Sequence, residues 1–198
     1  SDQIGAIVRY ISLAETMTTD PSLLEHLKKI EHSTAVIRKQ IQFARDYQNI
    51  GLNPPQWQNV DETIRRATKD LDLAGVRREN EMETLEIYAD LLLEKVFFNV
   101  ADNALRHGQK ETKIRFSAQE IPGGLAIFCQ DDGVGIPENI KEGVFRCDYS
   151  HNKGYGLFLA SEILSMTGLS VSETGEPGSG ARIEIRVPKG SYRFITVR

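Results

Sequence analysis

The chain lacks most of the features that mark a special class of protein. Its two cysteines, Cys129 and Cys147, have no metal-type spacing, which favours free buried thiols in a reducing compartment and leaves a disulfide open. No apolar run approaches the ~18 residues of a transmembrane helix, and no basic segment followed by an apolar one opens the chain as a secretory signal. We therefore expect a soluble, cytoplasmic chain without direct membrane contact.

The charge balance excludes a further class of partner. Lys and Arg number 24 against 28 Asp and Glu, so the formal net charge is −4, whereas a protein that binds nucleic acid along its whole chain is normally basic. Hydrophobic residues make up 40% and charged residues 26% of the 198 positions, which excludes disordered, collagen-like and disulfide-rich chains. We expect no nucleic-acid partner, and one domain with its own core, with or without a helical appendage.

The first fifty residues are poor in turn-forming residues, since Gly5 and Pro21 are the only glycine and proline among them. Apolar side chains recur there in steps of three and four residues, the spacing of a seam between helices. Asp20 is suited to cap a second helix whose first turn contains Pro21. We predict a helical hairpin over residues 1–50 that forms a homodimer, or else packs on the following domain, through the seam residues Leu23, Leu27, Ile30, Thr34, Ile37, Ile41 and Ala44.

A helix-breaking stretch follows the hairpin, because it contains Gly51, Pro54 and Pro55. We predict a linker over 51–60, a domain over 61–190 and a tail over 191–198. The domain is expected to contain three helices: one over 61–71, capped by Asp61, one from a cap at Asp90 to about 107, and one over 155–167. Its expected strands are 84–88, 113–117, 125–130, 169–172 and 181–187. The fold class is therefore α+β: a two-layer α/β sandwich of mixed, mostly antiparallel strands with helices on one face, preceded by the α-helical hairpin.

Glycine pairs and polar residues mark the candidate site. The chain has no G-x-x-x-x-G-K-[ST] phosphate loop, and its three G-x-G pairs lack the third glycine of a dinucleotide fingerprint, so each pair alone indicates only a turn. Their order carries more information. Asn99 and Asn103, one helical turn apart, precede Asp131-Asp132-Gly133-Val134-Gly135-Ile136-Pro137, then Gly154-Tyr155-Gly156-Leu157, and then Gly178-Ser179-Gly180.

In this order the four motifs resemble the ATP-binding domain of sensor histidine kinases, whose fold is shared with DNA gyrase, the MutL repair proteins and the heat-shock chaperone ATPases. The resemblance covers residues from about 57 to 190. It implies ATP and Mg²⁺ as cofactors, transfer of the ATP γ-phosphoryl group to a histidine, and a response-regulator receiver domain as a partner. The sequence departs from the family at Ala181, where the family often carries Thr, and after Gly190, where no counterpart is evident.

The resemblance also implies a role for each matching residue. Asp131 would accept a hydrogen bond from the adenine amine, beside Gly133, Gly135 and Ile136, where glycine lets the backbone approach the base. Asn99 and Asn103 would be the catalytic amides, with Asn103 as the Mg²⁺ ligand. The other ATP-binding candidates are two cations, a histidine and a helix start whose N–H groups favour an anion, namely Arg106, Lys153, His107, Gly154, Tyr155, Gly156 and Leu157.

Three of these candidates have ordinary alternatives. Lone basic residues such as Arg106 and Lys153 are usually only solvated. His107 is equally suited to a solvated place at the negative end of its helix.

Asn99 distinguishes between branches of the family. In the gyrase-like ATPases and the anti-sigma type of serine kinase, the position four before the metal Asn is a Glu that acts as general base, and an amide cannot take a proton at neutral pH. We therefore favour a histidine kinase, whose imidazole nucleophile already has a free lone pair. The alternatives are a nucleotide-binding pseudokinase and a gyrase-like ATPase module without kinase activity.

The hairpin resembles the dimerisation and phosphotransfer module of the same family, in which the acceptor histidine lies on the first helix. In this chain no histidine precedes His26, and both His26 and His32 fall on the second helix. We expect the hairpin to be truncated at its start, the acceptor histidine to lie upstream of Ser1, and the chain as given not to phosphorylate itself.

Overall fold

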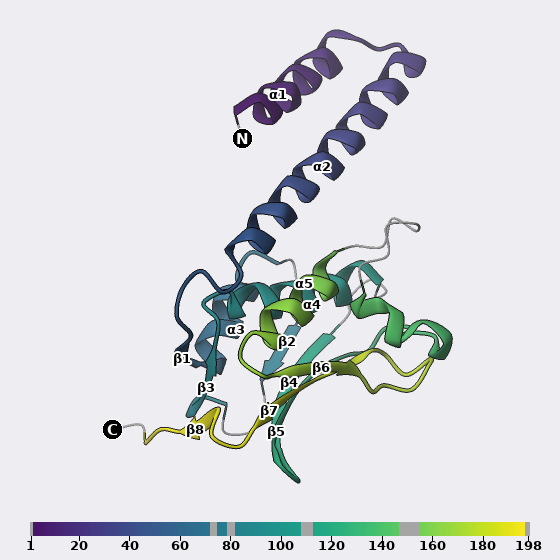
Figure 1. Ribbon diagram of the computed structural model, residues 1–198. Helices are drawn as coiled ribbons and strands as arrows, with labels where there is room; N and C mark the ends of the chain where they lie inside the picture. The colour runs from purple at the N-terminus through teal and green to yellow at the C-terminus, as the bar shows by residue number, and fades with distance from the viewer. Residues whose placement is uncertain (1, 72–74, 79–81, 108–112, 147–154, 197–198) are drawn as a thin grey trace. The chain divides into compact units, whose positions relative to one another are not determined.

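The computed structural model describes residues 2–71, 75–78, 82–107, 113–146 and 155–196 (Figure 1). The chain divides into two compact units, Ser1–Gln48 and Asn49–Arg198, which we call the hairpin unit and the sheet unit.

The hairpin unit consists of α1 (Asp2–Met17) and α2, which spans Pro21–Asn49 and so ends at the first residue of the sheet unit. Asp20 Oδ1 accepts the N–H of Ser22 at 2.9 Å, which confirms the predicted cap before Pro21. Among the described side chains of the hairpin, only a few are buried, namely Ile11, Leu27, Thr34 and Asp46. Most of the predicted seam is therefore not covered within the hairpin unit itself, with Leu23, Ile30, Ile37 and Ile41 each 41–49% exposed.

The described part of the sheet unit contains two sheets. The larger sheet has five strands in the order β2-β4-β5-β7-β6, which are Gly75–Arg78, Lys113–Ile121, Gly124–Asp131, Arg182–Pro188 and Ser170–Glu173. The smaller sheet has three strands in the order β1-β3-β8, which are Gln56–Asn59, Leu85–Ala89 and Tyr192–Phe194. Only the β2–β4 pairing is parallel among these strands, which confirms the expected mixed, mostly antiparallel arrangement.

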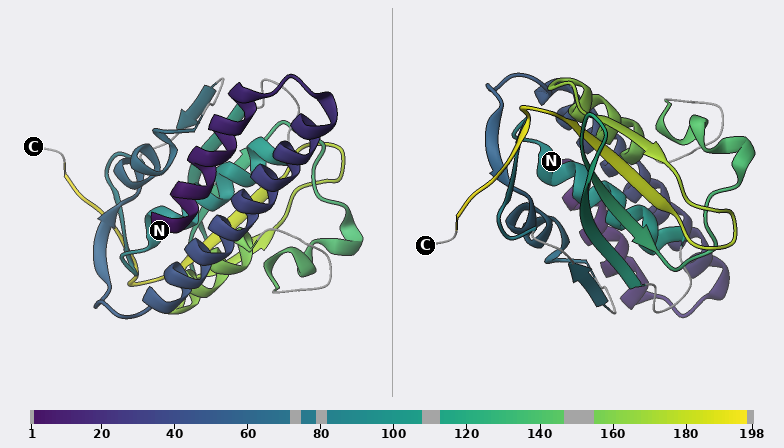
Figure 2. Two further views of the ribbon diagram at one scale, coloured as in Figure 1. Left: turned by 90° about the horizontal axis from the view of Figure 1, so that it is seen from above. Right: turned by 90° about the horizontal axis from the view of Figure 1, so that it is seen from below.

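Three helices complete the sheet unit, α3 (Val60–Thr68), α4 (Leu93–His107) and α5 (Gly156–Ser165). The strands of the larger sheet lie on one side of α4 and α5, as expected for a two-layer sandwich (Figure 1; Figure 2, right). Alternation along β4 explains the layer, because Ile114 and Phe116 are fully buried while Lys113 and Arg115 are exposed. The ring of Phe97 from α4 meets that of Phe116 at 6.0 Å between centroids and 85° between planes.

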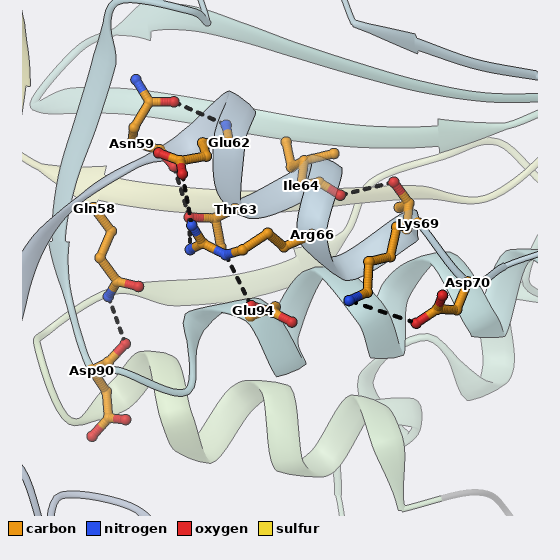
Figure 3. Close-up of polar contacts among 11 residues, drawn as sticks. Gln58, Asn59, Glu62, Thr63, Ile64, Arg66, Lys69, Asp70, Asp90 and Glu94 are labelled. Atoms are coloured by element: carbon orange, nitrogen blue, oxygen red, sulfur yellow. Dashed lines mark hydrogen bonds and ion pairs between the residues drawn. The ribbon is translucent and has the colours of Figure 1, made fainter.

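Helix α4 is fixed at its start by polar contacts. Asp90 is buried, and its Oδ1 accepts the N–H of Leu92 at 2.8 Å, which confirms the predicted cap. Gln58 donates its side-chain amide to the Asp90 carbonyl at 2.8 Å, and Arg66 of α3 contacts Glu94 of α4 at 3.1 Å (Figure 3). These contacts set the position of the helix that carries both candidate amides.

Two features of the sheet unit differ from the sequence predictions. The cap of α3 is Asn59, whose Oδ1 accepts the N–H of Glu62 at 2.9 Å (Figure 3), whereas the prediction of Asp61 is wrong because Asp61 instead pairs with Arg65 at 2.6 Å. Three short strands were not predicted, namely β1, β2 and β8. β8 pairs with β3 in antiparallel register, and an Arg193–Glu86 ion pair of 2.7 Å joins the two strands. The Arg193 guanidinium also lies 4.3 Å from the centre of the Trp57 ring.

Two short 3-10 helices, Glu138–Ile140 and Glu142–Phe145, follow the Gly133–Gly135 segment. In the described residues no helix is long and apolar enough to span a bilayer.

Candidate functional site

Asn99 and Asn103 lie one turn apart on α4, and both are half-buried. Asn99 packs against the first residue of α5, because a Cβ built on Gly156 would lie only 3.1 Å from Asn99 Oδ1. Glycine at 156 therefore lets α5 begin close against α4. The Asn99 Nδ2 group is buried and has no hydrogen-bond partner among the described residues, although buried amide donors are normally satisfied.

Asp131 ends β5 and is held by the backbone of the neighbouring loop. Its Oδ1 accepts the N–H of Gly133 at 2.9 Å and the N–H of Ala181 at 3.1 Å, and its own N–H donates to the Ala181 carbonyl at 3.0 Å. No hydrogen bond from the described residues reaches its second oxygen, Oδ2. One carboxylate oxygen is thus used for positioning, and the other stays available to a ligand.

Two glycine-containing loops meet beside Asp131. The N–H of Gly178 donates to the Val134 carbonyl at 3.0 Å. Gly135 and Gly180 have φ values of +73° and +86°, a region that disfavours a side chain. A Cβ on Gly180 would collide with the Asp131 carbonyl oxygen, and one on Gly135 would lie 3.0 Å from the Gly180 carbonyl oxygen. The motif glycines are therefore required where the two loops touch each other.

Ala181 acts in this site through its backbone. It stands where the histidine kinases it resembles often carry Thr, yet its N–H and carbonyl both bond to Asp131. A methyl side chain does not interfere with these bonds, so the departure does not disturb the position of Asp131. The sequence alone carried no signal for this pairing across fifty residues.

The remaining candidates are less fully defined. Arg106 pairs with Asp102 at 2.7 Å, so it is already engaged by a carboxylate of its own helix. Tyr155 lies at the N-cap of α5, Leu157 is buried in that helix, and Ile136 is half-buried. His107 is the last residue of α4. Outside the described residues lie the side chain of His107 and all of Lys153 and Gly154.

The thiol of Cys129, close to Asp131 on β5, has a raised pKa. Cys129 lies two residues earlier on β5, is 4% exposed and is free. Burial, and to a lesser degree the charge of Asp131, hold the pKa of the Cys129 thiol well above its ordinary value. The thiol is therefore neutral and unreactive at physiological pH. The structure does not describe Cys147.

One cavity of about 250 Å³ lies at the same end of the larger sheet, but mainly on the other face. Asp131 pairs with the buried Ile114, so its side chain is directed toward the helix layer. Gln130 pairs with the exposed Arg115, on the face without helices. The cavity is lined by Lys113, Arg115, Gln130, Asp131 and Asp132, and neither Asn99 nor Asn103 is among these residues. Within the described ranges no group of three or more His, Cys, Asp or Glu side chains is placed to hold a metal ion.

Comparison with known proteins connects this geometry to a family. Residues 89–191 match the family described as "Histidine kinase-, DNA gyrase B-, and HSP90-like ATPase". The alginate biosynthesis sensor protein KinB of Pseudomonas aeruginosa is 29% identical over 129 residues, which cover 63% of this chain and 21% of KinB. The sensor histidine kinase GtrS of the same species is 32% identical over 104 residues, which cover 50% of this chain and 21% of GtrS. The chain therefore spans about a fifth of the length of these relatives.

Solved structures share the fold. Full-length ShkA in complex with AMPPNP superimposes with a TM-score of 0.69 at 17% identity, covering 99% of this chain and 44% of ShkA. The ATP-binding domain of PrrB from Mycobacterium tuberculosis superimposes with a TM-score of 0.56 at 25% identity, covering 69% of this chain and 98% of that domain. These likenesses confirm the α+β fold class predicted for the chain.

Proposed function

Because the chain belongs to the family of histidine kinase-, DNA gyrase B- and HSP90-like ATPases, we propose that its sheet unit is the ATP-binding catalytic domain of a sensor histidine kinase. The reaction is transfer of the ATP γ-phosphoryl group to a histidine. The relatives named as sensor histidine kinases support this branch of the family. The single observation that carries the proposal is the state of Asp131, whose Oδ1 is held by two backbone N–H groups while its Oδ2 stays available.

Asp131 recognises adenine in this proposal. A carboxylate oxygen accepts only, so Oδ2 suits the exocyclic amine of adenine, which donates. The fixed Oδ1 keeps the carboxylate from turning away from the base. Gly133, Gly135 and Ile136 form the adjoining backbone against which the base lies.

The phosphates and their metal ion belong to the α4 side of the site. The residues there fit such a group, since the buried Asn99 Nδ2 has no hydrogen-bond partner within the described part of the chain and Asn103 offers a neutral oxygen. Mg²⁺ takes few protein ligands and keeps mainly phosphate and water oxygens, so one amide oxygen from Asn103 suffices. When bound, Mg²⁺ neutralises charge on the phosphates.

The start of α5 supplies positive potential for the same phosphates. Free N–H groups at a helix N-terminus attract anions, and this helix begins at Gly156 directly beside Asn99. Tyr155 and Leu157 flank that start, and we assign Lys153 and Gly154 to the phosphates from the motif alone. Arg106 already pairs with Asp102 through one nitrogen, so its remaining N–H groups are the ones that would contact a phosphate.

The chemistry of Asn99 favours kinase action over hydrolysis. An amide cannot remove a proton from water, whereas a neutral imidazole attacks the γ-phosphorus with its own lone pair. The protein then acts mainly by positioning and by neutralising charge. We expect ATP hydrolysis by this chain to be slow.

The hairpin unit provides the dimer in this proposal. Its apolar residues Leu23, Ile30, Ile37 and Ile41 are exposed in one chain and would be covered by the same helix of a second copy. A receiver domain of a response regulator is the expected phosphate acceptor downstream. The domain would work in the cytoplasm, where its ATP is found.

Isothermal calorimetry on Asp131→Asn tests the central assignment. The Asn oxygen can still accept from Gly133 and Ala181, so the fold is kept, while an N–H₂ group replaces Oδ2 and repels the adenine amine. A lost charge-assisted hydrogen bond of roughly 1.5–3 kcal/mol weakens ADP binding about ten- to over a hundredfold. Asp132→Asn is the matched control, because Asp132 instead accepts the N–H of Lys113 at 2.8 Å. Equal ADP affinity in wild type and Asp131→Asn would remove Asp131 from the site.

Labelling with γ-labelled ATP tests the phosphotransfer assignment. We expect no acid-labile label on the 198-residue chain alone, because α1 contains no histidine. Acid-labile label mapped to His26, His32 or His151 would contradict this expectation, and acid-stable label would indicate Ser, Thr or Tyr phosphorylation instead.

A further inference from the structure

A cluster of charges joins two segments outside the residues assigned so far. Lys141 follows the first 3-10 helix, and its side chain is 12% exposed. Glu173 ends β6, and its side chain is 0% exposed. The Lys141 Nζ and Glu173 Oε2 atoms lie 3.2 Å apart. Neither residue stands out in the sequence, since a buried charge pair leaves no periodic pattern.

Glu173 needs this ammonium group. Its Oε1 accepts the N–H of Gly175 at 3.0 Å and the N–H of Arg182 at 3.1 Å. Its Oε2 receives no well-aligned hydrogen bond from the described residues, so the neighbouring charge of Lys141 compensates it. A carboxylate removed from water is tolerated only with such compensation. Lys141 also donates to the Gly175 carbonyl and pairs with Glu138 at 2.9 Å.

Hydrogen bonds connect the cluster to Asp131, the residue proposed to recognise adenine. Glu173 fixes the N–H of Arg182, and the preceding residue, Ala181, fixes Asp131. Between Glu173 and Ala181 runs the loop whose Gly178 donates to Val134. Lys141 follows Val134 in the chain and donates to the Gly175 carbonyl. It therefore connects the segment after Val134 to the start of the loop Gly175–Gly180.

We propose that Lys141 and Glu173 are positioning residues for adenine recognition, which hold the loop Gly175–Gly180 against the segment that begins at Asp131. This inference rests on the proposed nucleotide site and adds a determinant of its shape. Neither side chain touches the nucleotide. Their effect passes through Arg182 and Ala181 to the Asp131 carboxylate.

Substitution of Lys141 by methionine in the whole chain tests the proposal. Methionine keeps the length of the side chain and removes the charge, which leaves Glu173 uncompensated and loosens the loop. We expect the dissociation constants of ADP and of ATP, each measured by calorimetry with Mg²⁺, to rise by the same factor of roughly ten, which corresponds to 1.4 kcal/mol. A residue that acts on the phosphates would weaken ATP more than ADP, so a selective loss of ATP affinity would overturn the proposal.

Two further variants separate positioning from general stability. Lys141→Arg keeps the charge and should restore most of the ADP affinity. The double variant Lys141→Met with Glu173→Gln removes the buried charge altogether, and a Gln oxygen can still accept from Gly175 and Arg182. It should bind ADP more tightly than Lys141→Met alone. If the single variant does not fold, recovery of folding in the double variant reports the same compensation, and failure of both to fold would overturn the proposal. Equal affinity of the single and double variants would overturn the proposal.

Controls keep this test apart from the proposed function. Lys29→Met removes an ion pair of 2.7 Å with Glu25 that is about two-thirds exposed at both side chains, and it should leave ADP affinity unchanged. Failure of the wild-type chain to bind ADP or ATP would contradict the proposed function itself. Wild-type binding together with unchanged affinity in Lys141→Met would contradict only the positioning role.

Discussion

The hairpin unit and the sheet unit are both well-formed secondary structure, yet they differ in what holds them. In the sheet unit, side chains from α4 and β4 such as Phe97 and Phe116 are at most 1% exposed. In the hairpin unit, Ile7, Tyr10, Leu13 and Met17 of α1 are 44–78% exposed. Helical periodicity is sufficient to form a helix but not to stabilise it, because short helices gain most of their stability from packing. The sheet unit therefore supplies its own core, whereas few apolar side chains of the hairpin unit are buried.

The largest expected effect is loss of a core ring from the sheet unit. Phe97→Ala deletes a fully buried side chain in contact with Phe116 and should lower the free energy of unfolding by about 3–5 kcal/mol. Tyr10→Ala in α1 removes a ring that is 73% exposed and should change the free energy of unfolding by less than about 0.5 kcal/mol. Urea titration followed by circular dichroism measures both. Similar values for the two variants would mean that the two units are stabilised alike.

The second prediction concerns the seam of the hairpin unit. Ile30→Glu with Ile37→Glu places two charges on side chains that are 48% and 49% exposed in one chain. Burial of each isoleucine in a dimer is worth roughly 1.5–3 kcal/mol, so the double variant should convert a dimer into a monomer in sedimentation velocity.

His32→Glu with Ala35→Glu is the matched control for this pair, because it adds the same charge at exposed positions away from the seam. The control should remain dimeric. A wild-type chain that is monomeric at micromolar concentration would contradict the seam as a dimer contact.

A smaller effect is expected at the start of α3. Asn59 Oδ1 accepts the N–H of Glu62, and its Nδ2 donates to the Glu83 carbonyl at 2.8 Å. Asn59→Ala removes both hydrogen bonds, whereas Asn59→Ser also loses the bond to Glu83 but keeps a capping oxygen. Asn59→Ser should therefore be more stable than Asn59→Ala by about 1 kcal/mol. Thermal unfolding of the two variants measures the difference, and equal stabilities would exclude a capping role.

The smallest expected effect depends on pH. The hydrogen bond to Glu138, together with Glu173, raises the pKa of Lys141 above its ordinary value of 10.5. A raised pKa in the folded state means that the stabilisation is fully present below pH 10.5 and is lost as the pH rises through the folded value. The wild-type melting temperature should therefore fall toward that of Lys141→Met above pH 10.5. A constant difference between the two proteins from pH 8 to pH 11.5 would contradict this.

The regular elements of the fold could be predicted because their signals are local. α4 has an apolar face and a capping Asp90, and the β4–β5 hairpin has the Gly123-Gly124 turn between an alternating strand and an apolar one. Strands β1, β2 and β8 have only three or four residues each, too short for alternation to be distinguished from loop. Their pairing depends on neighbours that are distant in sequence.

In the candidate site, too, some features could be predicted from the sequence and others could not. Asp131 and the motif glycines stood out by their order in the chain, so their meeting beside β5 was expected. The partners that hold Asp131 could not be predicted, because the backbone of Ala181 carries no residue-specific signal. The same holds for Lys141 and Glu173, which in the sequence resemble any solvated charged residues.

The buried thiol of Cys129 gives the sheet unit an internal reporter of its own opening. Alkylating reagents attack the thiolate, and in the native state the elevated pKa and 4% exposure leave almost none of it accessible. The labelling rate of Cys129, in a chain where Cys147 is replaced by Ser, is then set by how often β5 leaves the sheet. Because Cys129 lies two residues from Asp131, a bound nucleotide that keeps β5 in place would slow the labelling of Cys129. Mass spectrometry of the labelled chain would then report whether nucleotide is bound.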